Sequence, residues 1–196
     1  MRSRQDWIHS ELVTLLMIIV LLTAARSSLA DHYYIPTGSM EYSLLPGDRV
    51  VVDKTAYGLR IPLTRIDILG DRAPNRGDIA VFDSPADGTR LIKRIVAVAG
   101  DRVSLTAGML TVNGLVLGDA TLEQFGDKQA LLNLSDGGGP NMQQQVIPDG
   151  KLLALGDHRG NSLDGRYFGL LDEKELLGRA VGIYYRRDDG FVWKTL

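Results

Sequence analysis

The order of apolar and polar positions after residue 30 predicts a chain built mainly from short β-strands. Strands are expected where short runs rich in valine, isoleucine and leucine are bounded by glycine, proline or aspartate. They fall at 49–53, 78–82, 90–98, 109–112, 115–117, 152–155, 182–186 and 191–194. Asn113-Gly114 separates two of them and is the strongest short signal for a hairpin. We therefore expect a mostly β fold with a coiled or barrel-like sheet.

Other segments of the chain have patterns that predict helices and loops. Residues 121–134 predict a helix, and 172–177 predict one or two helical turns. The sequence Gly-Gly-Gly-Pro at 137–140 predicts a loop, and 55–76 is expected to be irregular and exposed. We expect a single folded domain, 31–196.

The first thirty residues carry an uncharged apolar run at 12–25. Two interpretations fit it. About 14 residues is the size of the apolar region of a secretory signal peptide, and Ser28-Leu29-Ala30 has small residues at the spacing of a cleavage site. Extended to 12–30, the segment approaches the roughly 20 residues of a membrane-spanning helix. Arg2 and Arg4 favour an N-terminus inside the cell, so both interpretations put the rest of the chain outside the cytoplasm.

Composition narrows the function classes. The chain has 196 residues, 44% hydrophobic and 23% charged, as expected for a globular protein. The net charge of −2 offers no basic excess, so a nucleic-acid partner is not expected. There are no cysteines and three histidines, which excludes thiolate sites and disfavours a multi-histidine metal site. We expect neither a metal nor another cofactor.

The first candidate for chemistry is Ser39, in the segment Pro36-Thr37-Gly38-Ser39-Met40. A glycine before a serine allows backbone N–H groups to approach a substrate carbonyl closely. The same residues also suit an ordinary turn before the strand at 49–53.

The second candidate is Lys93. In a strand it shares a face with Leu91 and Ile95, because alternate side chains point the same way. A snorkelling lysine at a strand edge would show the same pattern. However, burial among aliphatic side chains penalises the ammonium form, and a lysine of lowered pKa can serve as a general base.

The third candidate is the polar segment 156–167, which follows an apolar strand. Opposite charges recur close together in it, Asp157 with Arg159 and Asp164 with Arg166. The segment is then either a solvated, ion-paired loop or a polar cluster that orients a catalytic group. Spacing alone does not bring Ser39 and Lys93 together.

These segments resemble the type I signal peptidase family, the Ser-Lys leader peptidases. Four of its sequence boxes occur in family order. They are Ile-Pro-Thr-Gly-Ser-Met at 35–40, Arg-Gly-Asp-Ile-Ala-Val-Phe at 76–82, Leu-Ile-Lys-Arg-Ile-Val at 91–96 with Gly-Asp at 100–101, and the segment 156–167. A single Gly-Ser-Met would be weak, whereas four ordered boxes are specific.

The resemblance implies a role for each matching position. Ser39 would be the nucleophile and Lys93 the general base. The Ser39 N–H and the Thr37 hydroxyl would form the oxyanion hole, and Ser162 would hydrogen-bond to Lys93 and orient it. An ion pair of Asp164 with Arg166 would brace the site, with Asp157 and Arg159 as further structural support. Shallow apolar pockets for small residues at −1 and −3 of the substrate would be lined by Ile35, Pro36, Met40, Leu44, Leu91 and Ile92.

The resemblance also implies a fold, a place and a reaction. The family fold is a set of coiled, mostly antiparallel sheets. Residues 1–11 would be cytoplasmic, 12–30 would anchor the chain in the inner membrane, and 31–196 would face outward. The partners would be the lipid bilayer and the signal peptides of exported preproteins.

The chain departs from the usual family pattern. It has Tyr42-Ser43-Leu44 in place of Pro-Thr-Leu, and His158, Gly160 and Gly165 in place of asparagine, aspartate and serine. The alternatives are a Ser-Lys peptidase dedicated to one precursor of the pilin or conjugation type, a Ser-His-Asp hydrolase that uses His158, and a non-catalytic membrane-tethered β domain.

Overall fold

A computed structural model of the chain describes residues 9, 11–19, 29–60, 67–69 and 72–196. Residues 11–19 are helical and exposed. Within the described ranges no helix is long and apolar enough to cross a bilayer. The predicted anchor, 12–30, runs through residues 20–28, which lie outside the described ranges.

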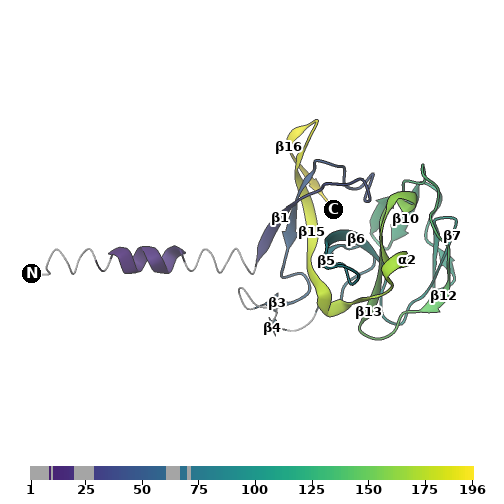
Figure 1. The fold of residues 1–196 in the computed structure, drawn as a ribbon, viewed down its shortest axis with the longest axis horizontal. Helices are drawn as coiled ribbons and strands as arrows, with labels where there is room; N and C mark the ends of the chain where they lie inside the picture. Colours follow the sequence, from purple (N-terminus) through teal and green to yellow (C-terminus); the bar gives the residue numbers. More distant parts are fainter. Residues whose placement is uncertain (1–8, 10, 20–28, 61–66, 70–71) are drawn as a thin grey trace, which may run out of the picture.

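The largest sheet contains eight strands in the described part of the chain (Figure 1). Its order is β1-β2-β15-β5-β6-β13-β14, with β16 paired to β15, and each pairing is antiparallel. The bounds are β1 Ala30–Tyr34, β2 Arg49–Asp53, β5 Ile79–Asp83, β6 Arg90–Ala97, β13 Lys151–Leu155, β14 Leu171–Asp172, β15 Leu176–Arg186 and β16 Gly190–Thr195.

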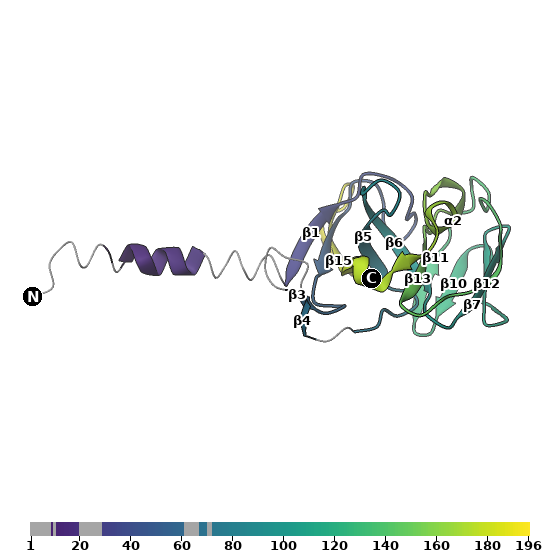
Figure 2. The same ribbon diagram turned by 60° about the horizontal axis from the view of Figure 1, so that its bottom comes forward.

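A second sheet packs beside the first, on the side of β6 and β13 (Figure 2). Its four strands run in the order β12-β7-β8-β9, with bounds β7 Arg102–Thr106, β8 Met109–Val112, β9 Leu115–Val116 and β12 Met142–Val146. Two further pairs are β3 Leu59–Arg60 with β4 Asp67–Leu69, and β10 Leu122–Phe125 with β11 Lys128–Leu131. The short helices are η1 Arg159–Asn161, α2 Gly165–Phe168 and η2 Glu173–Glu175.

Most of the predicted strands are confirmed to within a few residues, and the predicted hairpin turn is present. Asn113 and Gly114 both have positive φ, at 52° and 81°, as a two-residue turn that matches strand twist requires. The barrel-like arrangement is wrong, because the strand order of the large sheet ends at β1 and β14 and does not close.

The predicted helix at 121–134 is also wrong, because the segment forms the hairpin β10–β11. Glu123 and Phe125 are buried while Gln124 between them is exposed, which is the two-residue period of a strand. Gly126, at φ 66°, makes the turn.

Three clusters of buried apolar side chains hold the sheets together. One joins β6 and β13 to the second sheet through residues such as Val96, Leu105 and Leu153. Another lies under the segment that links β1 to β2. The third packs on β5, β6 and β13 and includes Ile95. Strand β6 therefore contributes to the core from both faces, which accounts for its near-continuous burial.

Candidate active site

Ser39 lies on the connection between β1 and β2, which is closed at its base by main-chain hydrogen bonds. The Ile35 N–H donates to the Asp48 carbonyl at 2.9 Å, and the Gly47 N–H donates to the Ile35 carbonyl at 2.8 Å. The buried Asp48 carboxylate also accepts from Arg186 of β15, at 2.9 and 2.6 Å. We call residues 35–48 the nucleophile loop, after the role that the sequence resemblance implies for Ser39.

Apolar side chains fix this loop on the sheet. Ile35, Met40 and Leu44 are buried in the cluster that includes Val50 of β2. Each such side chain contributes about 1.5–3 kcal/mol by leaving water. The Leu44 N–H donates to the Met40 carbonyl at 2.8 Å, which adds a local turn. Ser39 is thus held on a loop that is packed rather than free.

Lys93 reaches the serine from β6. Its Nζ lies 2.5 Å from Ser39 Oγ, across 54 positions of sequence. Ser39 is 9% exposed and Lys93 only 3% exposed. The predicted face of β6 is confirmed, because Leu91 and Ile95 pack in the same apolar cluster while Ile92 packs in another.

Burial lowers the pKa of Lys93 from its ordinary 10.5 to about 8. The carboxylates of Asp164 and Asp157 act in the opposite direction, and Arg166 adds to the lowering. At pH 7 about one lysine in ten is then neutral, against roughly one in 3,000 for a free lysine. A neutral amine within hydrogen-bond distance of a hydroxyl can accept its proton.

The segment after β13 carries buried charges that act electrostatically on Lys93. The Asp164 carboxylate accepts two hydrogen bonds from the Arg166 guanidinium, at 2.8 and 2.7 Å, and one from the Gly156 N–H at 2.9 Å. It also caps α2 by accepting the Arg166 N–H. Both partners of this ion pair are buried, so the segment is a polar cluster and not a solvated loop.

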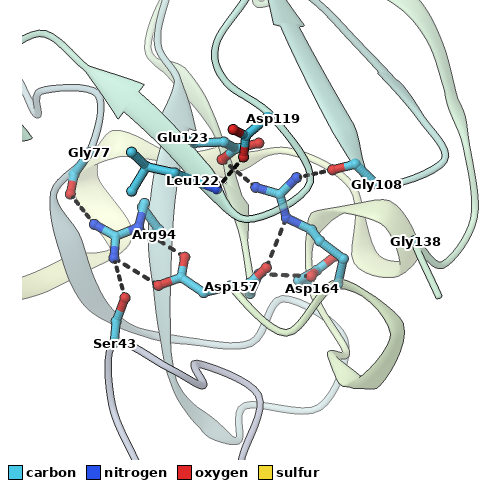
Figure 3. A network of polar contacts seen from close by, with 12 residues as sticks. Ser43, Gly77, Arg94, Gly108, Asp119, Leu122, Glu123, Gly138, Asp157 and Asp164 are labelled. Atoms are coloured by element: carbon cyan, nitrogen blue, oxygen red, sulfur yellow. Dashed lines mark hydrogen bonds and ion pairs between the residues drawn. The ribbon is translucent and has the colours of Figure 1, made fainter. Parts of the chain in front are cut away.

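Asp157 and Arg159, which are close in sequence, do not pair with each other. Asp157 pairs with Arg94 of β6, at 2.9 and 2.7 Å, and Arg94 also donates to the Gly77 carbonyl and to Ser43 of the nucleophile loop (Figure 3). Strand β13 is the neighbour of β6, with Leu155 opposite Arg94, so Asp157 leaves β13 beside that arginine.

Arg159 turns the other way and pairs with Glu123 of β10. The two charged groups are 2.5 Å apart and almost fully buried, and Arg159 also donates to the Gly108 carbonyl at 2.6 Å. Sequence reasoning missed Glu123, because the segment was assigned to a helix. The alternation in Leu-Glu-Gln-Phe was the available signal.

The expected hydrogen bond from Ser162 to Lys93 is not formed. Ser162 Oγ is buried and has no hydrogen-bond partner among the described residues. The hydroxyl lies close to Gly156, where an added Cβ would overlap it and would stand 2.5 Å from the Ser39 carbonyl oxygen. Only glycine therefore fits at position 156 between the two serines.

The chain matches a known protein family over most of its length. A family model described as signal peptidase, peptidase S26, matches residues 5–185. The chain belongs to this family. Signal peptidase I of Buchnera aphidicola (subspecies Acyrthosiphon pisum) is 27% identical, over 95% of this chain and 78% of the relative.

Two other relatives are similar over 85% of this chain. Signal peptidase I of Pseudomonas aeruginosa is 32% identical, and 69% of its length is covered. The probable signal peptidase I-2 of Synechocystis is 31% identical, and 68% of its length is covered. The family, and with it the class of serine endopeptidase, is as predicted from the sequence boxes.

The residues assigned to substrate pockets divide into two groups in this signal peptidase. Ile35, Met40 and Leu44 are core residues with almost no exposed surface. Pro36 is exposed, while Leu91 and Ile92 are half-buried on β6 beside Lys93. Among these six, the accessible apolar surface near the Ser39–Lys93 pair thus comes from Pro36, Leu91 and Ile92.

His158 is not placed as the base of a Ser-His-Asp triad. Asp157 and Asp164 are each paired with an arginine. The His158 ring faces the Gly38 carbonyl and the carboxylates of Glu41 and Asp136. In the described residues it is Lys93, and not His158, that contacts the Ser39 hydroxyl.

Proposed function

We propose that this signal peptidase cuts preproteins with Ser39 as the nucleophile and Lys93 as the general base. The observation that carries the proposal is the 2.5 Å approach of Lys93 Nζ to Ser39 Oγ, with both groups buried. Family membership gives the reaction class, and this contact supports the choice of the two residues.

The reaction is acyl transfer. Neutral Lys93 takes the proton of Ser39 Oγ as the oxygen attacks the scissile carbonyl, and it returns the proton to the leaving amine. Lys93 then activates the water that hydrolyses the acyl-enzyme. The Ser39 N–H, which donates no hydrogen bond within the described residues, and the Thr37 hydroxyl stabilise the oxyanion. With a pKa near 8, holding Lys93 neutral at pH 7 costs only about 1–2 kcal/mol, against about 5 for a free lysine.

The substrates we propose are signal peptides with small residues at −1 and −3. Pro36 before the serine, and Leu91 and Ile92 before the lysine, offer apolar surface of the kind that such side chains would contact. The buried Met40 and Leu44 would shape this surface from below.

We also propose that residues 12–30 anchor the enzyme in the inner membrane, with 31–196 on the outer face. The apolar run at 12–25 and the arginines before it support this topology. Strand β1 begins at Ala30 and the nucleophile loop follows it directly, so Ser39 stays within about 30 Å of chain from the membrane end.

The test uses the full chain purified in detergent, with a precursor that carries an Ala-x-Ala cleavage site. We expect the wild-type chain to process it, and Ser39→Ala and Lys93→Ala to lose more than about a thousandfold in rate, since the members of such a catalytic pair act as a unit.

Matched controls are Ser104→Ala on β7 and Lys194→Ala on β16, which remove the same side chains elsewhere and should process normally. Wild-type rates in both site variants would refute the assignment of Ser39 and Lys93. No processing by the wild-type chain would instead favour the non-catalytic domain. A panel of precursors in the same assay separates a general peptidase from one dedicated to a single substrate.

A further inference from the structure

The His158 ring is buried against the nucleophile loop, and the mechanism above does not use it. Its main-chain N–H donates to the Ser39 carbonyl at 3.2 Å. Its Nδ1 lies 3.3 Å from the Gly38 carbonyl oxygen and 3.3 Å from Glu41 Oε2. Its Nε2 lies 3.1 Å from Asp136 Oδ2. The ring therefore stands between the nucleophile loop and the loop after β11.

The proton on Nδ1 decides which of these contacts is a hydrogen bond. A carbonyl only accepts, so the contact with Gly38 requires an Nδ1–H. The competing neighbour is Asn133, whose Nδ2 lies 3.4 Å from the same nitrogen. Asn133 Oδ1 accepts the Ser135 N–H at 3.0 Å, which turns its amide NH₂ toward the ring. Without the proton, Nδ1 accepts from Asn133 and the bond to Gly38 is lost.

The contact with Gly38 bears directly on catalysis, because the Gly38 carbonyl and the Ser39 N–H belong to one peptide group. In a trans peptide these two groups point in opposite directions, and within the described residues the one cis bond is Glu41–Tyr42. A donor that holds the Gly38 carbonyl on one side thus aims the Ser39 N–H to the other.

We propose that His158 is a positioning residue for the reaction: with both ring nitrogens protonated, it ties Gly38 and Glu41 to Asp136 and so aims the Ser39 N–H at the oxyanion. The proposal rests on the proposed function, since it assigns that N–H to the oxyanion hole. Glu41 is part of the same arrangement. Its N–H donates to the Gly38 carbonyl at 3.0 Å, and its carboxylate covers Gly38 so closely that an added Cβ would stand 2.6 Å from Oε1.

The charged groups that face the ring come from two elements. Glu41 lies on the nucleophile loop and Asp136 on the loop after β11, and both are carboxylates. The neutral groups are Asn133 and Ser135 Oγ, the latter 3.4 Å from Nε2. The Gly38 carbonyl and both carboxylates only accept, so each of these contacts needs a proton on the ring nitrogen that faces it.

The test compares His158→Asn with His158→Ala in the full chain. An asparagine amide nitrogen can occupy the place of Nδ1 and donate to Gly38 at any pH. We expect His158→Ala to lower kcat about tenfold or more, the scale of a lost bond to a charged donor. KM should change less than about threefold, because an oxyanion donor acts mainly in the transition state. His158→Asn should restore kcat to within about threefold of wild type at pH 8.

Rescue by asparagine separates positioning from packing. A ring that only fills space would be replaced no better by asparagine than by alanine, whereas a donor at the place of Nδ1 is restored by asparagine alone. Asp136→Asn, which alters an exposed side chain, weakens the contact with Nε2 and should lower kcat by about threefold, while an unchanged kcat would contradict the tie to Asp136. The control His32→Ala, on the exposed edge strand β1, should leave kcat and KM unchanged.

Each outcome is decisive. Equal loss of kcat in the alanine and asparagine variants would show that the ring only fills space. A kcat for His158→Ala within twofold of wild type would also overturn the proposal. If Ser39→Ala and Lys93→Ala remain active in the same assay, the proposed function itself fails. Thermal unfolding of each variant identifies any that do not fold, in which case Asp136→Asn carries the test.

Discussion

The titration of Lys93 is the sharpest consequence of the site. Catalysis needs the neutral amine, and burial lowers the pKa of Lys93 to about 8. The rate should therefore rise with pH and level off above 8. Below pH 8, kcat/KM should fall close to tenfold for each pH unit, to about 9% of the plateau at pH 7 and about 1% at pH 6.

The assay is the initial rate of cleavage of a signal-peptide substrate well below KM, from pH 5.5 to 9.5 at constant ionic strength. His158→Asn provides a second background, because it removes the imidazole that contacts Gly38 beside Ser39. Ser39→Ala gives the uncatalysed rate. Lys93→Arg should be inactive at every pH, since a guanidinium stays charged. A midpoint near 10.5, or a rate that does not depend on pH, would refute the conclusion that apolar burial tunes this lysine.

Three further predictions concern single side chains. Lys93→Met should raise the free energy of unfolding at pH 7 by up to about 3 kcal/mol, because the wild-type fold buries an amine whose charged form prefers water. The free energy of unfolding of the wild-type chain should rise between pH 8 and pH 10.5, so the advantage of Lys93→Met should shrink over that range. Denaturant unfolding of both chains at the two pH values measures this. Arg159→Ala leaves the buried Glu123 without its charged partner and should lower the free energy of unfolding by about 3–5 kcal/mol. Lys151→Ala, which breaks an exposed ion pair, should lower it by less than about 1 kcal/mol. Similar losses in the two variants would contradict the role of burial. Thr37→Val should lower kcat about 10²–10³-fold with little change in KM, and an unchanged kcat would remove Thr37 from the oxyanion hole.

Local pattern was sufficient for much of the fold. The strands around Val50, Lys93 and Leu153 are short apolar runs with clear boundaries, and Asn113-Gly114 specifies its turn by its own backbone preference. The hairpin β10–β11 could not be separated from a helix in the same way. Its strands are only four residues each, and one of the two buried positions of β10 is the charged Glu123, which does not read as a core residue in the sequence.

The sequence by itself determined the family and the reaction class, because its four boxes carry the residue types of the chemistry in order. It also determined the face of β6 on which Lys93 lies. Only the tertiary structure decided the partners. Asp157 could pair with Arg159 two positions away or with Arg94 on the neighbouring strand, and the direction of β13 selected Arg94. The meeting of Ser39 with Lys93 likewise depends on how the nucleophile loop packs over the sheet, and such long-range packing is not encoded in any local spacing.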